Sequence, residues 1–220
     1  MIHVETENQA IRNTKIAEEN GADGVFLINH RISHKELQKV YLAVRNQFPK
    51  FWIGLNFLDL QREHALALMP RDANALWADD GGVHEAPTKG LAPRHGEAKH
   101  FSKLLDRSRW KGLYFGGVAF KTQKHANEPA LLARYATAFM DVVTTSGVST
   151  GRAPDHEKIR EMKDAIGQHP IAIASGVTPE NVLGYTLHTD CFLVATGVSD
   201  SFTELNPNRV RKFADVLASA

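Results

Sequence analysis

The sequence predicts one α/β domain of 220 residues, a closed (β/α)8 TIM barrel with no linker or domain boundary. Short apolar runs alternate with helical patterns eight times, and such alternation requires right-handed crossovers and a parallel sheet. The length suits one sizeable core. The last two apolar runs end in small-residue turns, where eightfold barrels usually bind phosphate. An open flavodoxin-like sheet is the alternative fold.

The expected strands are short runs of apolar residues, and continuous apolar sequence is typical of strands buried on both faces. They are Ile2–Glu5, Gly24–Asn29, Phe51–Phe57, Ala75–Ala78, Gly112–Phe120, Val142–Thr145, Ile171–Ala174 and Phe192–Ala195.

Helical spacing of apolar residues and capping residues predict the segments between these strands. Thr6 with Gln9 and Ser33 with Glu36 form capping-box patterns, and Asp59 is the expected cap of the third helix. The expected helices span 6–20, 33–48, 59–69, 96–106 and 128–140, with further helices starting near 154, 178 and 206.

Composition excludes several classes of protein. The formal net charge of +1 provides no strong field toward nucleic acid or an anionic membrane. No run reaches transmembrane length, and the first residues lack a signal-peptide pattern. The single cysteine, Cys191, forms no internal disulfide, so we expect a cytoplasmic protein. Whether it forms a homo-oligomer stays open.

The turns after the last two expected strands are the strongest candidate site. Backbone N–H groups of small residues at strand ends offer fixed donors to a phosphate. The candidate phosphate-binding residues are Ser175, Gly176, Val177, Thr196, Gly197 and Val198. The alternative is that these glycines only make tight turns between strand and helix.

A second polar cluster follows the sixth expected strand. Its hydroxyls and one guanidinium suit a second anion or a ribose. The candidate substrate-binding residues here are Thr144, Thr145, Ser146, Thr150 and Arg152. The alternative is an ordinary Ser/Thr turn that caps the helix opening at Asp155.

Titratable and polar residues at other strand ends are candidates for catalysis, because the carboxyl ends of barrel strands meet at one rim. Asp79 and Asp80 are candidate general bases, which His30 or Asn56 would assist. The alternative for the aspartates is capping of the following turn. Two further candidate substrate-binding residues are Glu5 and Lys121.

The long segment 81–94 has no periodicity and is predicted to form a lid over the site. His84, His95 and His100 flank it, but their spacing matches no metal-binding pattern. We therefore predict neither a metal nor a cofactor.

Two stretches resemble the signature of the BtpA family of photosystem I biogenesis proteins and their homologues. They are the TSG-to-APD run at Thr145–Asp155 and the SGVTPEN run at Ala174–Asn181. The resemblance covers the C-terminal third. It implies a phosphate-binding barrel related in shape to the ribulose-phosphate binders, without an agreed reaction, and one member class is tied to photosystem assembly.

The sequence is therefore compatible with two functions. One is an enzyme that binds a phosphosugar or phosphoribosyl compound and acts as a lyase, isomerase or transferase. The other is a non-catalytic assembly or regulatory factor that uses the barrel surface. A polar, carboxylate-lined bowl would favour the enzyme, and an exposed apolar patch would favour the factor.

Overall fold

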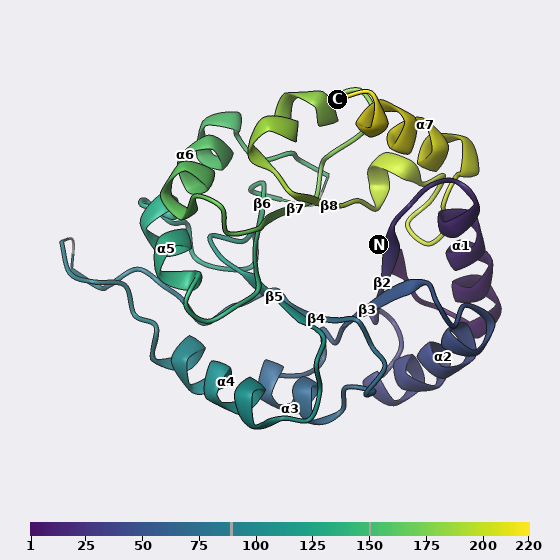
Figure 1. Cartoon of the computed structure of the whole chain (residues 1–220), viewed down its shortest axis with the longest axis horizontal. Helices are drawn as coiled ribbons and strands as arrows, with labels where there is room; N and C mark the ends of the chain where they lie inside the picture. The colour runs from purple at the N-terminus through teal and green to yellow at the C-terminus, as the bar shows by residue number, and fades with distance from the viewer. Residues whose placement is uncertain (89, 150) are drawn as a thin grey trace.

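A computed structural model describes residues 1–88, 90–149 and 151–220. Eight parallel strands form one sheet in the order of the chain, and Figure 1 shows it curled into a ring. The strands are β1 (Ile2–His3), β2 (Gly24–Ile28), β3 (Trp52–Asn56), β4 (Ala75–Ala78), β5 (Leu113–Gly117), β6 (Val142–Ser146), β7 (Ile171–Ala174) and β8 (Cys191–Leu193). This confirms the predicted barrel and excludes the open-sheet alternative, whose strands would not follow chain order.

The helices surround the ring on its outside (Figure 1). They are α1 (Glu7–Glu19), α2 (His34–Gln47), α3 (Arg62–Ala67), α4 (Gly96–Arg107), α5 (Pro129–Ala136), α6 (His156–Ile166) and α7 (Pro207–Ala218), with 3₁₀ helices η1 (Val182–His188) and η2 (Thr196–Val198). None of the helices in the described ranges is long and apolar enough to cross a membrane.

Strand residues alternate between two apolar layers, as the pleat requires. Val25 and Leu27 belong to the large cluster between the sheet and the helices. Phe26 belongs to the cluster inside the ring, where its side chain meets Trp77 and Phe115 edge to face at centroid distances of 5.6 and 5.2 Å. Aromatic side chains therefore pack inside the ring at this level.

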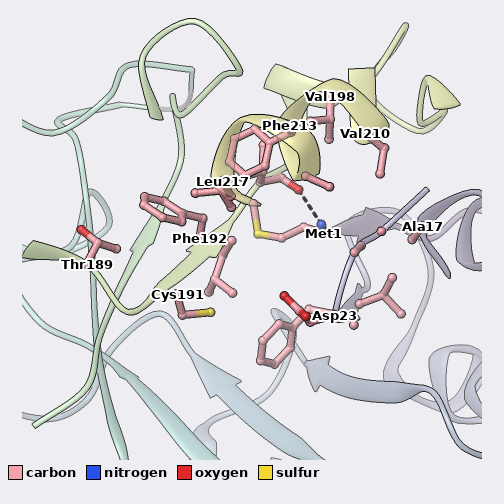
Figure 2. A pocket seen from close by; sticks show the side chains of 18 of the residues that line it. Met1, Ala17, Asp23, Thr189, Cys191, Phe192, Val198, Val210, Phe213 and Leu217 are labelled. Atoms are coloured by element: carbon pink, nitrogen blue, oxygen red, sulfur yellow. Dashed lines mark hydrogen bonds between the residues drawn. The ribbon is translucent and has the colours of Figure 1, made fainter. Parts of the chain in front are cut away.

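Between β8 and β1 the ring closes by contacts other than strand pairing. Among the described residues no strand ladder joins them, and the Met1 amine instead donates to the Val194 carbonyl oxygen at 2.5 Å. A cavity of about 630 Å³ lies along this seam, where Met1, Cys191, Phe213 and mostly apolar neighbours surround it (Figure 2). Burial lowers the pKa of the Met1 amine to about 5.

Local sequence signals predicted several helix starts correctly. Ser33 accepts from the backbone N–H of Glu36, whose carboxylate accepts from the Ser33 N–H, which completes the capping box. Thr6 accepts from the Gln9 N–H, but the Gln9 amide oxygen accepts from the Glu5 N–H, so only half of that box forms.

Two predicted helices differ in the structure. Asp59 does not cap α3, because its carboxylate accepts from His34 N and Asn29 Nδ2, and the helix begins only at Arg62. The segment from 178 forms no α-helix: it turns at Thr178 and continues as the 3₁₀ helix η1. Gly184 lies inside η1 and disfavours an α-helix there.

Candidate functional site

The mouth of the barrel, at the carboxyl ends of the strands, contains a cavity of about 330 Å³. Its lining combines aromatic, titratable and other polar side chains from most of the strand ends. The polar and aromatic residues that matter most are His3, His30, Asn56, Asp79, Lys121, Ser175, Thr196 and Phe202. Four of the predicted catalytic and substrate-binding residues, together with Ser175 and Thr196, therefore share one cavity.

Asp79 follows β4 and faces the end of β3. Its Oδ1 accepts from Asn56 Nδ2 at 3.1 Å, and Asn56 is only 2% exposed. Burial raises the pKa of Asp79, while the Asn56 hydrogen bond and the positive charge of Lys121 oppose this shift. A carboxyl group with a raised pKa beside a cavity suits general acid–base chemistry.

Lys121 follows β5, and its amine reaches across the mouth to the end of β7. Nζ donates to Ser175 Oγ at 2.9 Å, and the backbone N–H donates to Ser146 Oγ at 2.9 Å. Burial lowers the pKa of the amine, and the nearby carboxylate of Asp79 opposes this shift. Lys121 and Asp79 thus place an amine and a carboxyl group at one cavity.

His3 and Phe202 were missed at the sequence level. The two rings stack at 4.2 Å, and His30 meets the edge of the His3 ring at 4.6 Å. Burial lowers the pKa of His3 to about 3, with further lowering by the charge of His30. The available signal was the position of His3 in the first strand, which ends two residues earlier than predicted.

The turns after β7 and β8 pack closely against neighbouring backbone atoms. Ser175 has φ 80°, in the left-handed region that disfavours side chains, and Gly176 has φ 73°. A Cβ on Gly176 would overlap the backbone N of Ala153, and one on Gly197 would overlap the Val177 carbonyl oxygen. Packing alone therefore requires glycine at both positions, so the two glycines by themselves do not indicate an anion site.

The backbone N–H groups of these turns do indicate an anion site. Within the described ranges, the backbone N–H groups of Gly176, Val177, Thr196 and Gly197 have no hydrogen-bond acceptor in the protein. The Val198 N–H differs, because it donates to the Ala195 carbonyl oxygen at 3.0 Å. Four N–H groups on two touching turns resemble the donor sets that bind phosphate in proteins.

The residues of the polar cluster after β6 differ in their burial. Thr144, Thr145 and Ser146 are fully buried, and the Thr144 hydroxyl has no partner in the described part of the chain. Arg152 is exposed and does not line the mouth cavity. Thr150 lies outside the described residues.

A half-buried lysine, Lys158, supports this region from α6. Lys158 Nζ donates to the carbonyl oxygens of Ala119 and Ser146, each at 2.8 Å. Burial lowers the pKa of this amine to about 8. The two bonds tie the ends of β5 and β6 together, next to Lys121. Helical spacing gave no signal for this role.

Glu5, Asp80 and the described residues of the loop 81–94 do not line the cavity. Glu5 pairs with Arg31 at 2.8 Å, and the Asp80 carboxylate accepts from Gly82 N and Gln123 Nε2. Figure 1 shows the described parts of this loop extending away from the ring, so they do not cover the mouth. The predicted lid is therefore wrong for this structure. Glu85 explains the loop's direction, because its carboxylate accepts from the backbone N–H groups ahead of α5.

No protein-family model and no curated protein matches the chain in sequence. Its fold does match solved structures. Phosphoribosyl anthranilate isomerase from Thermus thermophilus shares 16% identity over 95% of this chain and 94% of its own, with a TM-score of 0.65. The isomerase from Thermotoga maritima shares 15% identity over the full length of both chains, with a TM-score of 0.68.

A third match is (S)-3-O-geranylgeranylglyceryl phosphate synthase from Thermoplasma acidophilum, solved with its substrate sn-glycerol-1-phosphate. It shares 13% identity over 98% of this chain and 90% of its own, with a TM-score of 0.67. At such identities the likeness establishes the fold alone. The fold is that of TIM-barrel enzymes whose names specify phosphorylated compounds.

Proposed function

We propose that this protein is an enzyme that binds a phosphorylated small molecule, a phosphosugar or a phosphoribosyl compound, at the mouth of the barrel. The observation that carries the proposal is the set of four N–H groups, on the turns after β7 and β8, that find no acceptor among the described residues. Fixed backbone donors bind a phosphate without needing a cationic side chain. Ser175 and Thr196 belong to the same turns and line the cavity.

The rest of the substrate would occupy the cavity between these turns and Asp79. Asp79 and Lys121 are the groups suited to proton transfer, because both are partly withdrawn from water and face the same space. Asn56 orients the Asp79 carboxyl through its hydrogen bond. The reaction would be a lyase, isomerase or transferase step that moves a proton on a phosphorylated substrate. Asp80 is engaged in its own turn and is the weaker candidate.

Similar proteins support this class of substrate. The synthase was solved with sn-glycerol-1-phosphate, and the isomerases are named for a phosphoribosyl compound. Transfer of the class to this chain relies on the shared barrel together with the donor turns, since a fold by itself does not specify function.

Kinship to the BtpA family remains a proposal, and one contact is consistent with it. The two signature stretches pack together, because Gly176 of the second lies against Arg152 and Ala153 of the first. This kinship suggests the second function, a non-catalytic assembly factor. The observation in its favour is exposed apolar surface on η1, where Leu183 and Leu187 are 54% and 87% exposed.

Thermal melting with inorganic phosphate, ribose 5-phosphate and phosphoribosyl pyrophosphate tests the proposal, with unphosphorylated ribose as the reference. A ligand at about 100 times its Kd stabilises by about 2.7 kcal/mol, which raises Tm by about 5–10 °C in a domain of this size. Thr196→Glu, which places a carboxylate among the donors, should remove the shift.

Thr88→Glu is the matched control, because Thr88 is exposed in the loop that extends away from the mouth. It should retain the full shift. If no phosphorylated compound raises Tm in the parent protein, the enzyme proposal fails and the assembly factor becomes the better account.

A further inference from the structure

The Lys121 amine lies at a position from which it could act as a nucleophile on a ligand in the mouth cavity. Its amine lines the mouth cavity and is held by Ser175 Oγ at 2.9 Å. Ser175 directly precedes Gly176, whose N–H belongs to the proposed phosphate donors. The amine therefore lies next to the expected position of the phosphate, within reach of a carbon a few bonds further along the substrate.

We propose that Lys121 Nζ forms an imine with the carbonyl carbon of a phosphorylated aldose or ketose bound in the mouth cavity. This inference rests on the proposed function for the position of the phosphate. It goes further by naming a covalent step and by restricting the substrate to carbonyl compounds.

The step is balanced by groups in the cavity. The neutral Nζ attacks the carbonyl carbon, the C=O π bond opens, and one Nζ proton moves to the oxygen to give a carbinolamine. Asp79 in its protonated form then gives a proton to that hydroxyl group, which leaves as water while the C=N bond forms, and the resulting carboxylate takes the remaining Nζ proton. The net change is amine plus carbonyl to imine plus water, without any oxidant or reductant.

The surroundings of the amine favour attack. Only the neutral amine is a nucleophile, and burial lowers the pKa of Lys121, which increases the neutral fraction at a given pH. The nearby Asp79 is the group that would supply the proton, because burial raises its pKa and favours the protonated form.

Lys158, which is half-buried as well, does not fit this role. Lys158 Nζ donates to two carbonyl oxygens at 2.8 Å and does not line the mouth cavity. It serves instead to fix the strand ends from which the Lys121 loop begins. Lys121 therefore lies where it can react with a bound ligand, whereas Lys158 stabilises the neighbouring strand ends.

Reductive trapping tests the inference. The protein is incubated with ribose 5-phosphate or dihydroxyacetone phosphate, treated with sodium borohydride, and mapped by peptide mass spectrometry. The expected result is one adduct on Lys121, with the mass of the ligand less one oxygen atom. Lys124→Met, which removes an exposed amine of the same loop, should retain the adduct.

Lys121→Met and Lys121→Arg should both lose the adduct, and the arginine variant keeps the charge in case the methionine variant folds poorly. Adducts spread over surface lysines, Lys124 included, would overturn the inference, as would none at all. A Tm shift with ribose 5-phosphate but no adduct would refute the imine and leave the proposed function standing. Absence of both would refute both.

Discussion

Acid should destabilise this protein through one histidine, His3. Its folded pKa of about 3 lies well below the ordinary 6.5. A depressed folded pKa means that the stabilising contribution is complete above about pH 6.5 and is lost as the pH falls toward 3. At about pH 5 the unfolded chain binds the proton and the folded chain does not, which lowers the free energy of unfolding by about 2 kcal/mol.

The perturbation is His3→Phe, which keeps a ring to stack on Phe202 and removes the titrating group. The free energy of unfolding of both proteins is measured with urea at about pH 7.5 and about pH 5. The decrease between the two pH values is then compared between the parent and the variant. The parent should lose about 2 kcal/mol more than the variant, equivalent to about 4–8 °C in Tm. Equal losses would refute the assignment of His3 as a buried neutral histidine.

Three further changes test other parts of the structure. Gly197→Ala should lower the free energy of unfolding by about 1–3 kcal/mol in urea, because its methyl group would overlap the Val177 carbonyl oxygen, whereas Gly96→Ala adds a methyl in open space and should not. Lys158→Met leaves two carbonyl oxygens without their donor and should cost about 2–4 kcal/mol by the same measurement; no loss would contradict its supporting role. Glu85→Gln weakens three hydrogen bonds that hold the loop after β4, so limited proteolysis of that loop should accelerate several-fold while the urea midpoint stays constant.

The barrel was predictable because its signals are local and repeated. Each buried strand is a continuous apolar run, and each long helix has apolar residues at helical spacing. Errors of a residue or two in the bounds of an element therefore do not change the number of predicted strands and helices. Ser33 shows the same rule at one residue, since its capping box depends only on residues three positions apart. Asp59 shows the limit: a partner from the previous unit, His34, competes for the same carboxylate.

The site was only partly predictable, for a related reason. Asp79 and Asn56 were found because strand ends meet at one rim, and the structure joins them by a hydrogen bond. Phe202 and Lys158 reach the region from a loop and from a helix, so no strand-end rule indicates them. Glu5 was misplaced because the first strand ends at His3, which moves the cavity-lining position back along the chain.

The most direct test of the central claim is an amide spectrum of the ¹⁵N-labelled protein titrated with ribose 5-phosphate. The account predicts that the backbone amide resonances of Gly176 and Gly197 shift as their N–H groups gain an acceptor. Gly167, at the end of α6, should stay unchanged. Saturable shifts confined to the turns after β7 and β8 would support a phosphate site there. Unperturbed amides at Gly176 and Gly197 would contradict it.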